Sequence, residues 1–190
     1  MITYLKKSDN ELISLFNDEG NEKALESLIN RYKDRLYKTV LFIVKDKYHA
    51  EDISQEVFIK IIETLKNGKY KEEGKFLPWA LRITHNLCVD YFRKLKKFSF
   101  AKSSDEYNVI ETINSADINA EEKIIHTQNF GNASNLLEQL PEEQREVIVL
   151  RHFANLSFKE IADITGCSIN TALGRMRYGL INLRKMMTGK

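Results

Sequence analysis

Residues 156–187 have the sequence LSFKEIADITGCSINTALGRMRYGLINLRKMM, which is typical of two helices separated by a tight turn. Ser157 and Glu160 have the spacing of a capping box, in which the hydroxyl and the carboxylate satisfy early backbone N–H groups. Gly166 can end the first helix, and Ser168 can cap a longer second one. The stretch therefore predicts a helix-turn-helix, a motif whose second helix lies in the major groove of DNA.

The second helix of this motif has few acidic neighbours, since Asp163 is the only acidic residue after Glu160. Arg175 is a candidate for bidentate contact with a guanine, whereas Arg177 and Arg184 are candidates for phosphate contacts that position the helix. A repeat of apolar residues predicts which face of the helix packs inward, and it consists of Leu173, Met176, Leu180, Leu183 and Met187.

Charge is segregated along this 190-residue chain. The formal net charge is only +2, which argues against a protein that coats nucleic acid with a uniformly basic surface. Basic residues gather at 93–97 and at the C-terminal end, whereas residues 105–122 are mostly acidic. Such segregation favours separate polyanion-binding surfaces joined by a solvated connector.

The cysteines and the hydropathy bear on the cellular compartment. Cys88 and Cys167 lie far apart and give no disulfide framework, as in proteins of a reducing compartment. No apolar run has the length of a membrane span, and the N-terminal residues lack the apolar core of a leader peptide. We therefore expect a cytoplasmic protein without membrane insertion.

Helical periodicity dominates the remainder of the chain, and no segment shows the alternation of a strand. Apolar stripes at residues 25–40 and 53–65 predict two long helices. Pro141 followed by two glutamates is typical of a further helix start. A third long stripe consists of Trp79, Ile83, Leu87, Tyr91 and Leu95.

The stretch between these helices has a different composition. Residues 98–119 lose the periodicity and are rich in Ser, Asn, Asp and Glu, which favours a flexible acidic linker. The expected fold class is therefore all-α, with two small helical domains at residues 8–97 and 120–190.

Three segments in this order resemble the extracytoplasmic-function class of bacterial sigma factors. They are AEDISQEVF at 50–58, FLPWALRITHNLCVDYFRK at 76–94, and LPEEQR at 140–145 together with the helix-turn-helix at 157–183. The resemblance covers nearly the whole chain. It implies that the first domain corresponds to sigma region 2 and the second to sigma region 4.

This resemblance implies a function in transcription initiation. A sigma factor of this class binds core RNA polymerase, directs it to the −35 and −10 elements of promoters and assists strand opening, with no covalent chemistry of its own. We therefore expect no enzyme activity, no cofactor and no metal. The expected partners are core RNA polymerase, promoter DNA in duplex and single-stranded form, and an anti-sigma factor, with a monomer as the free state.

The resemblance also implies candidate site residues. The polar face of segment 50–58 would contact core polymerase through Asp52, Gln55, Glu56 and Phe58, although Phe58 fits a core position equally well. The promoter-proximal candidates are Lys75, Arg82, Asn86, Asp90, Arg93, Lys94 and Lys97, with Asn86 and the loop at 69–76 as candidates for holding a flipped base. The upstream-element candidates are Ser168, Asn170, Thr171, Gly174, Arg175, Arg177, Tyr178 and Arg184.

The chain departs from the class at two positions. Relatives commonly carry Lys and Ser where this chain has Leu173 and Gly174, so we expect a different upstream-element preference.

Two other functions are compatible with parts of the sequence. A metal-dependent nuclease is disfavoured because the sequence shows no set of acidic residues that would converge on one metal ion. His85 with Cys88 also supplies too few ligands for structural zinc. A stand-alone helix-turn-helix regulator, binding an operator as a dimer, is the alternative function.

Overall fold

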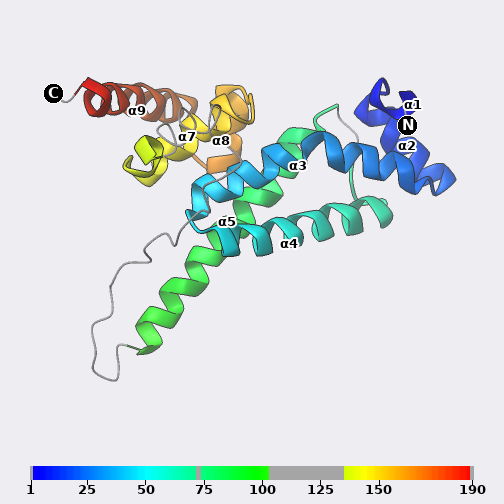
Figure 1. Cartoon of the computed structure of the whole chain (residues 1–190), viewed down its shortest axis with the longest axis horizontal. Coiled ribbons are helices and arrows are strands. Elements are labelled where there is room, and N and C mark those ends of the chain that lie inside the picture. The colour runs from blue at the N-terminus through cyan, green and yellow to red at the C-terminus, as the bar shows by residue number, and fades with distance from the viewer. Residues whose placement is uncertain (1, 72–73, 103–134, 189–190) are drawn as a thin grey trace, which may run out of the picture.

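The computed structural model describes residues 2–71, 74–102 and 135–188, and within these ranges the chain is helical without a strand (Figure 1). The all-α prediction is therefore confirmed. The helices are α1 (Ile2–Leu5), α2 (Asp9–Glu19), α3 (Glu22–Val44), α4 (Lys47–Lys66), α5 (Phe76–Lys102), α7 (Glu142–His152), α8 (Phe158–Thr165) and α9 (Ile169–Thr188).

The first domain is built on α3, α4 and α5, which pack their apolar stripes against one another. Val40, Val57 and Leu81 are fully buried at the centre of this core. The third predicted stripe is correct as far as Tyr91, but Leu95 is 42% exposed because the C-terminal part of α5 extends away from the other helices (Figure 1). Helix α5 continues to Lys102, and the remainder of the predicted linker, residues 103–119, lies outside the described residues.

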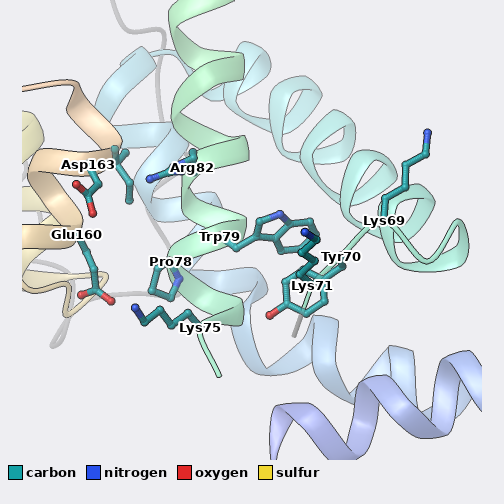
Figure 2. A pocket seen from close by; sticks show the side chains of 10 residues that line it. Lys69, Tyr70, Lys71, Lys75, Pro78, Trp79, Arg82, Glu160 and Asp163 are labelled. Carbon is teal, nitrogen blue, oxygen red and sulfur yellow. The ribbon is translucent and has the colours of Figure 1, made fainter. Parts of the chain in front are cut away.

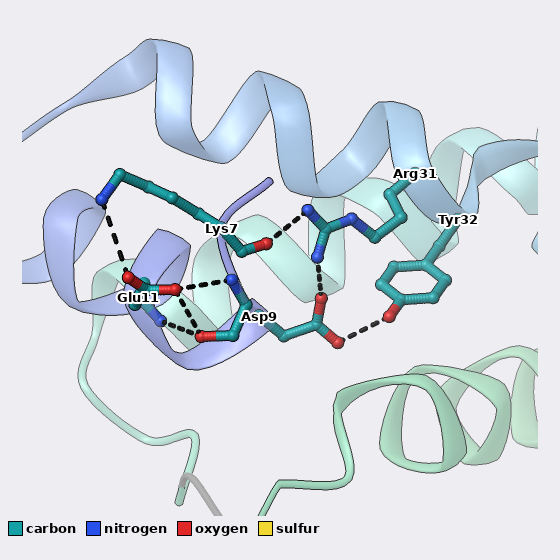
Figure 3. Close-up of polar contacts among 6 residues, drawn as sticks. Lys7, Asp9, Glu11, Arg31 and Tyr32 are labelled. Atoms are coloured by element: carbon teal, nitrogen blue, oxygen red, sulfur yellow. Dashed lines mark hydrogen bonds and ion pairs between the residues drawn. The ribbon is translucent and has the colours of Figure 1, made fainter. Parts of the chain in front are cut away.

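A polar cluster fixes the N-terminal helix α2 on α3 (Figure 3). The Asp9 carboxylate accepts hydrogen bonds from Arg31 and from the Tyr32 hydroxyl, each at 2.6 Å. Arg31 also donates to the Lys7 carbonyl oxygen at 2.7 Å. Burial, and then the hydrogen bond to Asp9, raise the pKa of Tyr32 to about 12, so the hydroxyl is a neutral donor at physiological pH.

The second domain contains the predicted helix-turn-helix in α8 and α9. Ser157 and Glu160 form both hydrogen bonds of the capping box, and Gly166 ends α8 with a left-handed φ of 65°. Ser168 caps α9, since its hydroxyl accepts a hydrogen bond from the Thr171 N–H at 3.0 Å. All three local predictions from the sequence are confirmed.

The predicted inward face of α9 is wrong for three of its five residues. Leu173, Leu180 and Met187 are 44%, 50% and 73% exposed. The buried positions are instead Ala172 and Gly179, which lie on a neighbouring face of the same helix. The physical reason is the close approach of α7, because a Cβ built on Gly179 would lie 2.7 Å from Ile148 Cδ1.

Gly179 should therefore not tolerate a large side chain. We expect Gly179→Leu to lower the free energy of unfolding by about 1–3 kcal/mol, the usual cost of overpacking a helix contact. Gly174→Leu is the matched control, because nothing lies within 4 Å of a Cβ built at Gly174. It should leave stability unchanged or raise it by up to about 1 kcal/mol, since leucine favours helices more than glycine. Thermal and urea unfolding of both variants would measure the difference, and equal effects would contradict the assignment of a helix crossing at Gly179.

The two domains pack directly on each other, through contacts of α3 with α7 and of α5 with α8. Phe42 from α3 lies among apolar side chains of the second domain, with its ring centroid 4.8 Å from that of Phe153. Val147 and Leu150 of α7 belong in turn to the apolar cluster of the first domain. The second domain is thus docked on the first through apolar contacts.

No helix among the described residues has the length and apolarity needed to cross a bilayer.

Candidate nucleic-acid interface

A cleft lies between the loop that precedes α5, the first turns of α5, and α8 (Figure 2). Its first wall carries the cations Lys69, Lys71, Lys75 and Arg82 together with Tyr70 and Trp79. Its second wall carries Glu160, Asp163 and Ile164 from α8. The predicted promoter-proximal residues Lys75 and Arg82 therefore lie on one surface, as expected from the sequence.

Aromatic rings line the first wall of the cleft. Phe76 is 2% exposed and lies beneath the half-buried Trp79, with ring centroids 5.5 Å apart. The Tyr70 ring lies 4.5 Å from the Trp79 ring, which holds the indole in place. Rings flanked by cations are the arrangement with which proteins stack unpaired bases and bind the phosphates of a single strand. Sequence reasoning assigned Trp79 to the core, and its ring does pack against the apolar cluster of the first domain. Tyr70 belongs to the loop at 69–76 that the resemblance selected, but it was not named there individually.

The remaining promoter-proximal candidates continue along α5 beyond the cleft. Their spacing of three, four or seven residues places most of them on one side of the helix. Asp90 accepts a hydrogen bond from Arg93 at 2.6 Å and so reduces the positive charge there locally. The exposed residues of this remaining set are Asn86, Arg93, Lys94 and Lys97.

The polar face of α4 is on the surface, as expected. Asp52, Gln55 and Glu56 are exposed, whereas Phe58 is half-buried against the core of the first domain. Ile59, which sequence reasoning did not select, is 55% exposed and lies three residues from Glu56 on the same face. An exposed apolar side chain beside polar and acidic residues is the usual composition of an interface centre with a polar rim.

The upstream-element candidates on α9 divide into two groups. Asn170, Thr171, Arg177, Tyr178 and Arg184 are exposed, and so is the cap residue Ser168. Gly174 and Arg175 are half-buried, and the guanidinium of Arg175 lies 3.6 Å from the Glu143 carboxylate of α7. Arg175 thus faces the neighbouring helix, and Arg177 is the more accessible of the two arginines.

An ion pair of low exposure joins the domains behind the cleft. His85 Nε2 of α5 lies 2.7 Å from Glu146 Oε1 of α7, and the two side chains are 13% and 15% exposed. Burial opposes protonation of the ring, but the hydrogen bond and the negative charge of Glu146 outweigh it and raise the pKa of His85. Nearby, burial raises the pKa of Cys88 to about 12, so this thiol is unreactive.

The raised pKa of His85 predicts a pH-dependent domain contact. The ion pair requires a protonated ring, so its contribution is complete below the ordinary pKa of 6.5 and is lost as the pH rises through the raised value. We expect small-angle X-ray scattering to give a smaller radius of gyration at pH 6 than at pH 8. His85→Gln should remove this difference, and an unchanged pH dependence in that variant would assign it to another group.

Among the described residues, no three His, Cys, Asp or Glu side chains gather as a metal site requires. A basic and aromatic cleft on a helical domain, followed by a capped helix-turn-helix, defines a two-domain DNA-binding protein. Family models agree with this class: Sigma-70 region 2 matches residues 28–98, and Sigma-70 region 4 matches residues 131–173. The chain belongs to the sigma-70 family, in its extracytoplasmic-function (ECF) group, whose members act in transcription initiation.

Individual relatives support this assignment. The chain is 29% identical over 175 residues to the ECF RNA polymerase sigma factor SigE of Mycolicibacterium smegmatis, an alignment that covers 90% of this chain and spans 65% of that relative's length. It is 26% identical over 173 residues to the ECF RNA polymerase sigma factor SigW of Bacillus subtilis, covering 89% of this chain and 91% of the relative.

Two solved structures have the same fold. One is CnrH in complex with the cytosolic domain of CnrY, with a TM-score of 0.67, 20% identity, and coverage of 97% of this chain and 99% of the other. The second is the sigma factor RpoE with the anti-sigma factor NepR from Bartonella quintana, with a TM-score of 0.67, 19% identity, and coverage of 87% and 98%.

Proposed function

We propose that this chain binds core RNA polymerase and directs it to promoters with two separate elements. The observation that supports this most strongly is the presence of three surfaces in one chain. These are the acidic face of α4, the basic and aromatic cleft beside α5, and the exposed side of α9. The α4 face and the α5 side of the cleft lie in the segment that matches region 2, and the first turn of α9 lies in the segment that matches region 4.

Each surface has its own part in this proposal. The exposed carboxylates of Asp52 and Glu56 bind a basic surface of the polymerase, where complementary charge speeds encounter and fixes orientation. The cleft around Trp79 receives unpaired bases of the −10 element while Lys75 and Arg82 hold phosphates. The α9 helix enters the major groove of the −35 element.

An anti-sigma partner is part of the same proposal. The RpoE structure contains the anti-sigma factor NepR, and a regulator of this kind would act by covering the surfaces that bind polymerase. The free chain would be a monomer, because the apolar faces of both domains pack against each other within one molecule.

Mapping of transcript 5′ ends tests the function. The purified chain is mixed with sigma-free core polymerase and genomic DNA from its source. We expect new starts that lie downstream of one shared two-part motif and disappear when the chain is omitted. A stand-alone helix-turn-helix regulator would add no starts and would bind duplex DNA tightly without polymerase. That alternative also leaves the cleft and the α4 face without a role.

A further inference from the structure

We propose that Leu173 of α9 determines part of the sequence preference for the upstream element, because its side chain contacts the 5-methyl group of a thymine in the major groove. This inference deepens the proposed function and rests on it, since it concerns the surface of α9 that binds duplex DNA. The group recognised is one methyl on a base edge, which distinguishes thymine from the other bases of DNA.

Leu173 is exposed because the helix packs through a neighbouring face. Ala172 and Gly179 are the buried residues of α9, whereas the Leu173 side chain is 44% exposed. Ile169, four residues earlier and therefore one helical turn away, is 46% exposed. The two side chains form an apolar patch on the first two turns of α9. This is the end of the helix with which a helix-turn-helix contacts base edges.

The residues around Leu173 favour DNA as the partner of this face. Asn170, Arg177 and Arg184 are exposed, and their spacing from Leu173 places all four side chains on one side of the helix. Arginines bind phosphates, and an asparagine amide can pair with the edge of an adenine. Helix α9 also carries no acidic residue, so this side is complementary in charge to a duplex.

Gly174 permits a close approach of this face to the bases. It follows Leu173 directly, and nothing lies within 4 Å of a Cβ built there, so the backbone at this position is open on its outer side. A position without a side chain allows the backbone to come near a ligand. The adjacent leucine then reaches the base edges, where thymine offers an apolar methyl group. Opposite guanine or cytosine, the same side chain would remove water from polar groups without replacing their hydrogen bonds, which is unfavourable.

Comparison of thymine with uracil tests the proposal, because the two bases differ only in the 5-methyl group. The full-length chain, with core polymerase present, first selects duplexes from a library with a randomised upstream region. We expect wild type to select a thymine at one position or more that Leu173→Ala does not select. Each thymine of the wild-type element is then replaced in turn by deoxyuridine, in a duplex that lacks the −10 element.

One of these replacements should weaken the binding of wild type by about 4-fold. Burial of one methyl group contributes about 0.8 kcal/mol, and a tenfold change in affinity corresponds to about 1.4 kcal/mol. Leu173→Ala should bind the thymine and uracil duplexes equally at that position, because the alanine side chain is too short to reach the methyl group. The cycle of two proteins and two bases isolates this contact from other effects of either change.

Leu180→Ala is the matched control, since it makes the same chemical change at another exposed position of α9. Leu180 lies seven residues further along the helix, about 10 Å beyond Leu173 and away from the end that contacts base edges. It should keep the wild-type ratio of affinities for thymine and uracil. Leu173→Met, which retains a long apolar side chain, should keep that ratio as well. Both alanine variants should fold, because the positions are exposed and alanine favours helices.

Equal binding of wild type to thymine and uracil at every position would overturn the proposal, and so would a difference that persists in Leu173→Ala. If Leu173→Ala instead loses affinity for core polymerase with an unchanged ratio, the side chain contacts a protein and the proposal is wrong.

Mapping of transcript starts keeps this inference apart from the proposed function. A chain that supports promoter starts but does not distinguish thymine from uracil keeps its function and loses the methyl contact. A chain that distinguishes them through Leu173 but adds no starts keeps the contact and loses the proposed function.

Discussion

Reversal of two charges on α4, Asp52→Lys with Glu56→Lys, should weaken binding to core RNA polymerase by about 100-fold at low salt. That factor corresponds to about 2.7 kcal/mol, and like charges placed in contact across an interface cost several kcal/mol. The fold should survive, because both residues are exposed and the Glu56 carboxylate contacts only Lys60, at 3.7 Å on the surface. An exposed pair of this kind contributes little to stability.

Titration of labelled core polymerase at two salt concentrations measures this effect. The loss should fall mainly on the association rate and shrink as salt rises, since charges separated by more than about 10 Å are screened at 0.1 M. Asp18→Lys with Glu19→Lys is the control, because it changes the net charge equally at exposed positions of α2. If both double variants lose affinity equally, net charge rather than the α4 face explains binding.

Local signals in the sequence predicted the helices and their ends. The capping box of Ser157 and Glu160, the Ser168 cap and the Gly166 turn each depend on neighbours within a few residues, and each is present. The long stripes of α3 and α4 were also predictable, because burial on one face of a helix follows from spacing alone.

Packing between elements was not predictable in the same way. The inward face of α9 is set by Gly179, whose missing side chain permits the close approach of Ile148. Glycine adds nothing to an apolar repeat, so the pattern favoured Leu173 and Leu180, which are exposed. The contact of Arg175 with Glu143 was not predictable either, because it depends on how α9 packs against α7.

In the candidate site, too, the residues of one segment were predictable and the contacts between domains were not. Lys75 and Arg82 were predicted together because Arg82 lies within, and Lys75 directly before, the segment at 76–94 that resembles a sigma motif. The opposite wall could not be predicted, because Glu160 and Asp163 come from a different domain and only the docking of α8 brings them to the cleft. The pair of His85 with Glu146 also depends on that docking.

Arg175 and Arg177 should differ in their contributions to upstream recognition. Arg175→Ala removes a half-buried side chain that lies beside Glu143 of α7, so we expect it to weaken upstream recognition while core polymerase binding stays intact. Arg177 and Arg184 are exposed and two helical turns apart, which places both on one side of α9. Their contribution should be to the phosphates of the duplex rather than to the identity of its bases.

The double variant Arg177→Glu with Arg184→Glu should therefore weaken binding of the holoenzyme to duplex upstream DNA by about 100-fold, nearly independently of sequence. The slope of log affinity against log salt is negative, and each lost phosphate contact reduces its magnitude by about 0.9, so the magnitude should fall by about 1.8. Fluorescence anisotropy on a duplex that lacks the −10 element isolates this step. Lys23→Glu with Lys33→Glu, two exposed changes on α3, should leave both affinity and slope unaltered. A loss confined to one preferred sequence, with an unchanged salt slope, would instead show that these arginines contact bases, because contacts to bases discriminate between sequences and contacts to phosphates do not.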